Sequence, residues 1–248
     1  MSESAIVPAS GPAQTGSRTE EVSTVREKDA IQCVFDGIVY GIRSGQMVPG
    51  QHLVEADLTR RFGVSRGSLR EGLKRLAATG IVTLTRYRGA FISALDRKGV
   101  ADLLDVLEPL CTLAATLAAE KKPDGSKVAE LQKIAQALSR EGDGHGRATY
   151  LEMRRRFYDL LIEIGGNTEL KNVIPLARTD LFRAQFDTVQ TKEQRRLHAS
   201  GYSKIAEAVA EGDPAKASRA VKKHFVSTRK TLVELPEHAF SASHGSRS

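Results

Sequence analysis

The sequence predicts a mainly α-helical protein with two domains: three helices and a β-hairpin come first, and an antiparallel bundle of six or seven helices follows. Two observations predict this fold class. Apolar residues recur at helical spacing along most of the chain, and over residues 81–93 this period gives way to two short strand-like runs. A length of 248 residues allows two domains of modest size, each with its own core.

The N-terminal domain is predicted over residues 26–95. Its first helix covers about residues 27–44, where four aliphatic residues recur at helical spacing: Ile31, Val34, Ile38 and Ile42. A helix over 55–62 follows and ends at Gly63, because glycine accepts the positive φ of a tight turn. The next helix covers 66–79, and two strands complete the domain. This order is that of a winged helix-turn-helix.

The C-terminal domain is predicted over residues 96–234 and is helical throughout. After a first helix that runs to about residue 117, further helices are expected at about 127–141, 147–164, 168–188, 193–211 and 214–233. The start of the last one is marked by Asp213, a potential N-cap, and Pro214 at the first helical position. Residues 1–25 and 235–248 are rich in small and polar residues, and we expect both to be disordered.

Positive charge is concentrated in the helix-turn-helix and the hairpin. Residues 58–88 hold eight basic side chains and one acidic one, Glu71, and this excess equals the net charge of +7 of the whole chain. Such a run often forms only a solvated face. Here it coincides with a helix-turn-helix, whose second helix presents its N-terminal end to the major groove of DNA. The sequence therefore favours binding to double-stranded DNA.

The N-terminal end of the second helix carries side chains suited to DNA. Arg66 and Arg70 are four residues apart and project from one side, where each guanidinium can bond guanine O6 and N7. Hydroxyls and helix N-terminal amides can hold phosphates. The residues that we expect to contact DNA are Ser65, Arg66, Gly67, Ser68, Arg70, Arg86, Arg88 and Gly89.

Four separated motifs in this domain resemble the N-terminal domain of the GntR family of regulators. They are Pro-Gly-Gln-His-Leu-Val-Glu at 49–55, Phe-Gly-Val-Ser-Arg-Gly-Ser-Leu-Arg-Glu at 62–71, Gly-Ile-Val at 80–82 and Arg-Gly-Ala-Phe-Ile at 88–92. The resemblance implies that Arg66 and Arg70 read the operator and that Gly89 approaches the minor groove. Gly72 departs from the family, which usually has alanine there, and glycine lowers helix propensity by about 0.5–1 kcal/mol.

The second domain resembles the helical ligand-binding domain of the FadR-like subfamily, in which many members bind a divalent metal. The metal-ligand positions of that subfamily correspond here to Arg154, Tyr158, Tyr202 and His224. Arginine does not ligate cations and phenols are poor ligands for zinc or nickel, so we expect no metal and no other cofactor. His198, one helical turn from Tyr202, is not expected to replace it.

The same four side chains are expected to line an effector pocket instead. A fixed positive charge, two phenols and an imidazole suit an organic carboxylate, and a second cation can come from Arg178 or Arg183. For Arg154, the alternative is an ordinary solvated base in the run Arg154-Arg155-Arg156, and for His224 a half-buried histidine without a ligand.

Together these features predict a ligand-responsive transcription regulator, a repressor of a catabolic operon that a small organic acid releases from its operator. It is expected to be a homodimer, because two half-sites require two recognition helices. In the alternative, the helical domain only assembles the dimer and senses nothing. An enzyme is not expected, since the chain lacks P-loop, GxSxG and HExxH motifs. No long apolar run or signal peptide is present, so we expect a cytoplasmic protein without membrane contacts.

Overall fold

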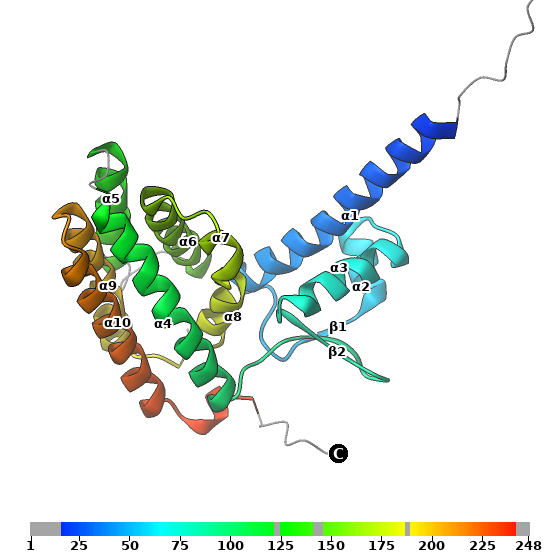
Figure 1. The fold of residues 1–248 in the computed structure, drawn as a ribbon. Helices are drawn as coiled ribbons and strands as arrows, with labels where there is room; N and C mark the ends of the chain where they lie inside the picture. Colours follow the sequence, from blue (N-terminus) through cyan, green and yellow to red (C-terminus); the bar gives the residue numbers. More distant parts are fainter. Residues whose placement is uncertain (1–15, 122–124, 141–145, 187–188, 242–248) are drawn as a thin grey trace, which may run out of the picture.

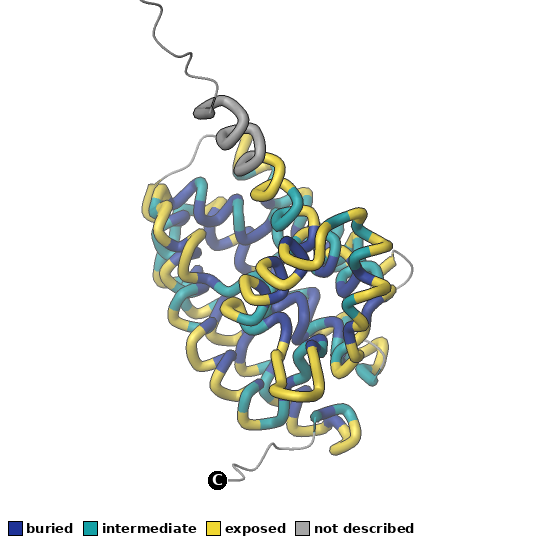
Figure 2. The backbone as a smooth tube through the Cα atoms, turned by 90° about the vertical axis from the view of Figure 1, so that its right-hand side faces the viewer, coloured by how far each residue is buried: buried dark blue, intermediate teal, exposed yellow. Residues whose placement is uncertain are grey.

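A computed structural model describes residues 16–121, 125–140, 146–186 and 189–241. The N-terminal domain and the helical domain form two lobes, and the long first helix extends outward from the smaller one (Figure 1). Buried backbone lies inside both lobes and exposed backbone follows their outer edges (Figure 2). The expected fold class is confirmed: the chain is mainly helical, with one small antiparallel sheet in its described part.

The N-terminal domain is a winged helix-turn-helix. In chain order its elements are α1 (Gly16–Ser44), β1 (His52–Leu53), α2 (Glu55–Phe62), α3 (Arg66–Ala78), β2 (Val82–Thr85) and β3 (Gly89–Ile92). The predicted hairpin forms with Val82 opposite Ile92 and Thr85 opposite Gly89. The short strand β1, which was not predicted, pairs with the other edge of β3. Aliphatic side chains of α1 and α3 pack in the core of this domain together with residues of the sheet and of the connecting segments.

The first helix begins earlier than expected. It starts at Gly16 instead of Glu27, so residues 16–25, which were expected to be disordered, are helical. No glycine or proline occurs between Ser17 and Asp36, and the helical hydrogen-bonding pattern can therefore continue towards the N-terminus. Residues 1–15, the rest of the expected disordered tail, lie outside the described residues.

Seven helices make up the described part of the C-terminal domain. They are α4 (Arg97–Glu120), α5 (Gly125–Arg140), α6 (Arg147–Gly165), α7 (Leu170–Val173), α8 (Leu176–Phe186), α9 (Lys192–Ala210) and α10 (Pro214–Glu234). The single helix expected at 168–188 is wrong, because it is divided at Pro175. Ile174 has the extended conformation (ψ 114°) that a following proline imposes, and α8 starts afresh after it.

Part of the C-terminal tail is ordered, contrary to expectation. Leu235 and Phe240 are buried against the helical core because both are large apolar side chains, and the Phe240 ring packs on Phe186. The Ser241 amide donates to the carbonyl of Leu95, in the segment that joins the two domains. The Gln185 side chain accepts from the Leu95 amide and donates to the same Leu95 carbonyl. Leu95 in the linker is thus hydrogen-bonded both to α8 and to the C-terminal segment.

Helix α8 belongs to both cores. Leu181 and Ala184 are buried among the side chains of the winged helix, whereas Phe182 and Phe186 are buried in the helical bundle. The helix lies between the lobes and packs on α1 (Figure 1). The two domains are therefore joined by a continuous apolar contact as well as by the linker.

The departure at Gly72 has a packing reason that the sequence did not show. A Cβ atom at this position would come within 2.7 Å of Val34 Cγ1 and 2.8 Å of Val34 Cβ, on the facing helix α1. Both distances are well below a normal carbon–carbon contact. The missing side chain therefore allows α1 and α3 to approach closely, and this offsets the lower helix propensity.

We predict that Gly72→Ala destabilises the protein although alanine is the better helix former. The added methyl group collides with the stiff, β-branched Val34, and overpacking of a core costs about 1–3 kcal/mol. Gly67→Ala is the matched control on the same helix, since its Cβ would meet nothing closer than the Ser65 hydroxyl at 3.6 Å. Urea denaturation measures both. Equal stability of the two variants would contradict the packing explanation.

Candidate functional site

The turn of the helix-turn-helix fixes the N-terminal end of α3. Gly63 has φ 64°, and its amide donates to the carbonyl of Thr59 at the end of α2. Ser65 is the N-cap of α3, and its hydroxyl accepts from the amide of Ser68 over 3.0 Å. Two short helices are thereby held at a fixed angle, with the first turn of α3 at the surface.

Most of the side chains expected to contact DNA are exposed on this surface. Ser65, Arg66, Gly67 and Arg70 are all exposed at the start of α3. Ser68 is the exception, because it is only 6% exposed and its hydroxyl lies 2.9 Å from that of Ser65. The Ser68 backbone amide and hydroxyl instead contact the Ser65 hydroxyl at the helix cap, so its side chain is less accessible for the expected DNA contact than its neighbours.

An ion pair orients Arg70 from the neighbouring helix. Arg70 Nε lies 3.1 Å from Oε2 of Glu55, at the start of α2, and both side chains remain accessible to water. Sequence analysis missed Glu55, because an acidic residue in a DNA-binding segment gives no direct signal for DNA contact. The pair is weak at a surface, so Arg70 can exchange Glu55 for a base edge at little cost.

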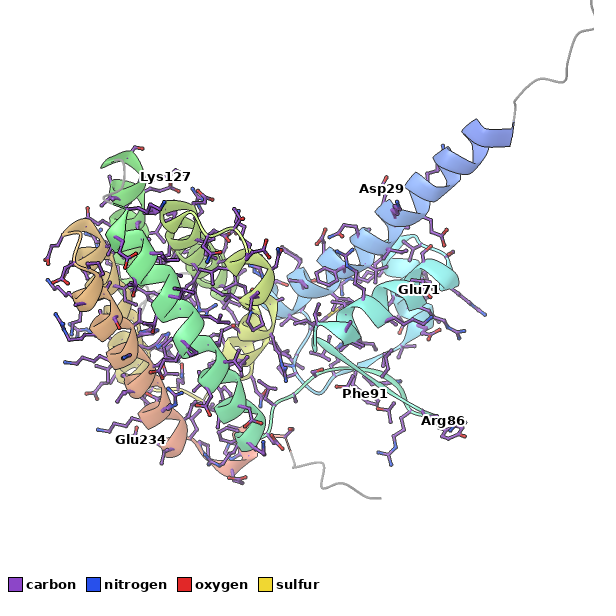
Figure 3. The ribbon with its side chains drawn as sticks, viewed as in Figure 1. Asp29, Glu71, Arg86, Phe91, Lys127 and Glu234 are labelled. Carbon is purple, nitrogen blue, oxygen red and sulfur yellow. The ribbon has the colours of Figure 1, made fainter. Side chains whose placement is uncertain are left out.

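The hairpin forms an exposed cationic wing. Arg86, Arg88 and Gly89 are exposed at its tip, and Figure 3 shows Arg86 at the end farthest from the helical bundle. Between the two arginines lies Tyr87, which has φ 71° and is 92% exposed. Tyr87 was not among the residues that the sequence analysis singled out. The sequence signal for this exposed ring was an aromatic residue between two arginines at a hairpin tip.

A second group of polar side chains lies inside the helical domain, and we call it the buried polar cluster. Its members come from four helices: Arg154 and Tyr158 from α6, Arg183 from α8, His198 and Tyr202 from α9, and His224 from α10. Arg154, Tyr158, Tyr202 and the two histidines are each at most 5% exposed. The structure thus brings together five of the six residues expected in the effector pocket and adds His198.

Arg178 is not part of this cluster. It lies on α8 nearer the winged helix, within 3.5 Å of the Cβ position of Gly80, and it lines a cleft of about 430 Å³ at the base of the hairpin. The sequence left Arg178 and Arg183 as alternatives for a second cation. Only Arg183 reaches the cluster, because five residues along a helix place the two side chains on different faces.

His198 links the members of the cluster by hydrogen bonds. Its Nε2 lies 3.3 Å from the Tyr202 hydroxyl, and its Nδ1 lies 3.1 Å from the Thr228 hydroxyl and 3.4 Å from Arg183 Nη2. The His198 and His224 rings are 4.1 Å apart. Sequence analysis set His198 aside because it is one turn from Tyr202. The i, i+4 spacing that separates the two side chains along the axis also places them on one face.

Burial and positive charge keep both histidines neutral. Burial, followed by the charges of Arg183 and Arg154, lowers the pKa of His224 to about 3. Burial and the charge of Arg183 hold the pKa of His198 well below its usual range. Burial likewise raises the pKa of the nearby Cys111 thiol to about 12, so this thiol is not a nucleophile at neutral pH.

The cluster has hydrogen-bond donors without acceptors. Within the described part of the chain, Arg154 Nε, Arg154 Nη1 and Arg183 Nε are buried and have no hydrogen-bond partner, and neither does His224 Nδ1. An unsatisfied buried donor costs about 1–3 kcal/mol, and more when it is charged. An anion placed among them removes this cost.

These residues do not fit a metal ion. The guanidinium of Arg154 lies at the centre of the cluster, where it repels a cation, with its Cζ 5.0 Å from the centre of the Tyr158 ring. Among the described residues, no group of three or more His, Cys, Asp or Glu side chains is arranged to hold a metal. The chemistry of the donor set favours an anion instead.

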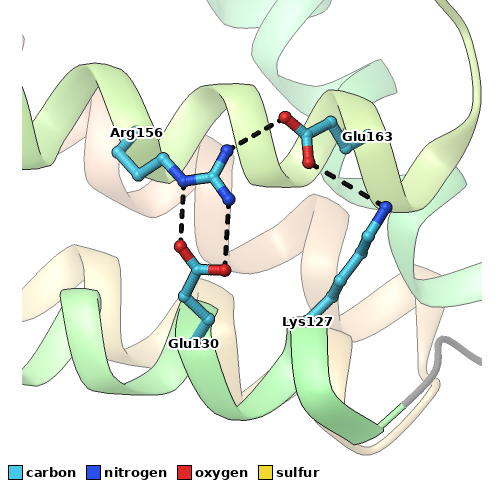
Figure 4. Close-up of polar contacts among 4 residues, drawn as sticks. All are labelled: Lys127, Glu130, Arg156 and Glu163. Carbon is cyan, nitrogen blue, oxygen red and sulfur yellow. Dashed lines mark hydrogen bonds and ion pairs between the residues drawn. The ribbon is translucent and has the colours of Figure 1, made fainter.

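The run of three arginines on α6 divides between the inside and the outside of the domain. Arg154 is buried in the cluster, whereas Arg156 lies at the outer surface in a network with acidic partners (Figure 4). There it makes two bonds to Glu130, of 2.9 and 3.1 Å, and one of 2.9 Å to Glu163. The solvated-base alternative describes Arg156 and does not describe Arg154.

A winged helix-turn-helix joined to a helical domain with a buried cationic cluster defines a two-domain transcription regulator. Residues 31–92 match the model of the bacterial regulatory proteins of the gntR family, and residues 102–227 match the FCD domain. The chain therefore belongs to the GntR family of transcription regulators, with an FCD domain, and is not an enzyme. None of its described helices is long and apolar enough to cross a membrane.

Relatives agree with this assignment. The chain is 25% identical to the HTH-type regulator YcbG of Bacillus subtilis, over 86% of this chain and 94% of YcbG. It is also 25% identical to the regulator YdhC of the same species, where the match covers 54% of this chain and only 59% of YdhC. The solved structure of E. coli McbR/YncC has a similar fold, with a TM-score of 0.71 at 16% identity, over 83% of this chain and 97% of that one.

We predict that stability falls steeply as the pH drops below about 6.5. His224 has a folded pKa of about 3, so the unfolded chain binds a proton that the folded one excludes, and stability is lost as the pH falls through the unfolded value. Below that pH, each such histidine lowers the free energy of unfolding by about 1.4 kcal/mol for each pH unit. Denaturation between pH 4.5 and 7 measures the slope, which His224→Gln should reduce by that amount. An unchanged slope in the variant would show that His224 accepts a proton when folded.

Proposed function

We propose that this regulator binds operator DNA as a homodimer, represses a catabolic operon, and is released from DNA when a small organic anion binds the buried polar cluster. The observation that supports the anion most directly is the pair of buried guanidinium groups, Arg154 and Arg183, with unsatisfied N–H donors inside a closed helical domain. The exposed arginines of α3 and the wing support the DNA contact.

The cluster favours a carboxylate over a neutral ligand. The two positive charges of the guanidinium groups face only one negative charge there, that of the Asp180 carboxylate. Both histidines are neutral, so they do not change this balance. Arginine binds a carboxylate through two parallel N–H donors, and the Tyr158 and Tyr202 hydroxyls add neutral donors. The rings of Phe157, Tyr158 and Tyr202 pack edge to face beside these groups, which suits an effector with an aromatic or other flat body.

Two copies are proposed because one winged helix reads only one half-site. The outer face of the helical domain offers a surface for self-association. Exposed aliphatic side chains lie along its helices α4 and α10: Val106, Leu113, Val226 and Val233. A second copy of this face would cover them in an isologous contact. In the alternative function, this contact is the only role of the helical domain, and no small molecule binds to it.

We predict that Arg66→Ala and Arg70→Ala each weaken operator binding by about 1–3 kcal/mol and relax the preference at one base pair per half-site. Arg86→Ala and Arg88→Ala should weaken all sequences about equally and reduce the salt dependence. Gel shifts with DNA selected from a random pool measure both effects. Lys171→Ala, which removes one exposed charge from α7, is the control and should leave affinity unchanged. An α3 double variant that binds like the wild type would contradict the assignment of the recognition helix.

We predict that a thermal-shift screen of small carboxylates finds a stabilising ligand and that Arg154→Gln and Arg183→Gln each weaken its binding about ten- to a hundredfold. A charge-assisted hydrogen bond in a buried site contributes about 1.5–3 kcal/mol, which corresponds to that loss. Titration calorimetry measures it. Arg156→Gln is the matched control, because Arg156 is bound to Glu130 and Glu163 outside the cluster. If only neutral or cationic compounds bind, the anion proposal is wrong; if nothing binds, the assembly-only alternative is favoured.

A further inference from the structure

One buried carboxylate contacts guanidinium groups from both domains. Asp180, on α8, is 1% exposed. Its Oδ2 accepts a 2.8 Å hydrogen bond from Arg155 Nη2 of α6 and lies 3.9 Å from Arg43 Nε of α1, in the winged helix. Its Oδ1 lies 3.5 Å from Nη1 of Arg154, in the buried polar cluster. Asp180 is therefore placed between the proposed effector site and the first helix of the DNA-binding domain.

Two of the three contacts are ion pairs without a hydrogen bond. Among the described residues, Asp180 Oδ1, Arg154 Nη1 and Arg43 Nε all lack a hydrogen-bond partner although they are buried. Buried polar atoms are normally paired, because leaving them unpaired costs free energy. The carboxylate thus has one firm partner, Arg155, and two incomplete ones, Arg154 at Oδ1 and Arg43 at Oδ2. A small shift of its side chain towards either arginine is enough to complete a hydrogen bond with it.

Direct packing contacts connect Asp180 to the recognition helix α3. The neighbouring residue Leu181 is buried in the core of the winged helix, and α8 packs on α1. Helix α1 in turn packs closely on α3, where the Val34 side chain fills the space left open at Gly72. Interfaces packed this tightly move as units and do not deform gradually.

We propose that Asp180 transmits occupation of the effector site to the DNA-binding domain by exchanging Arg154 for Arg43. An anion that binds Arg154 withdraws this guanidinium from Asp180. The carboxylate then closes the 3.9 Å gap to Arg43 Nε and forms the missing hydrogen bond, which fixes α1 against α8. This mechanism rests on the proposed anion site, but the charge link itself can be tested without any ligand.

Arg154→Gln imitates the occupied state, because it removes the same partner from Asp180. The full-length chain is compared as wild type, Arg154→Gln, Asp180→Asn and the double variant, with Arg156→Gln as the control outside the link. Hydrogen exchange of the α1 backbone amides over residues 31–44 is measured relative to α5, which packs on α6 and α9. We expect Arg154→Gln to slow exchange in α1 about two- to fivefold and Asp180→Asn to accelerate it.

The double variant decides the mechanism. Without the carboxylate nothing responds to the loss of Arg154, so the double variant should exchange like Asp180→Asn alone. If Asp180→Asn does not fold, Arg43→Gln replaces it, since that side chain lies at the domain boundary and is 19% exposed. Unchanged exchange in Arg154→Gln, or the same slowing with and without Asp180, would overturn the link. The anion site fails separately, when no carboxylate binds the wild type.

Discussion

The burial of α8 against two cores is the constraint on which the arrangement of this regulator depends. A helix that served the bundle alone would need one apolar face, but α8 presents Phe182 to the bundle and Leu181 to the winged helix. Asp180 lies between these faces, where a lone carboxylate would be strongly unfavourable. The three arginines around it are therefore required by the packing, and they bring charged side chains of both domains to one point.

The elements of the fold were largely predictable, because each depends on local signals. Helical spacing predicted the long helices, and Gly63 predicted the turn between α2 and α3. The division of the helix expected at 168–188 was also encoded locally, in Pro175, and was missed. The role of Gly72 was not local. Val34, which packs against Gly72, lies far away in the sequence. Helix propensity alone therefore showed only that glycine at this position lowers the stability of the helix.

The family resemblance predicted four members of the buried polar cluster. The residues that it did not identify show what information a comparison of sequence positions leaves out. Arg154, Tyr158, Tyr202 and His224 do lie together, because the packing of α6, α9 and α10 brings these buried positions next to one another. Glu55, His198 and Asp180 were not found, since each acts through a partner on another helix or on the next turn. Sequence spacing identifies which residues share a face, whereas partners across an interface depend on how helices are packed.

The hydrogen bonds around Leu95 have a geometric consequence for the proposed dimer. Gln185 and Ser241 both hydrogen-bond to Leu95 in the linker, so it does not act as a free tether for the winged helix. Each recognition helix is then carried at a set distance and angle from the helical domain. In the proposed dimer, two winged helices held in this way would set the distance between the recognition helices, and with it the separation of half-sites along the duplex that the dimer accepts.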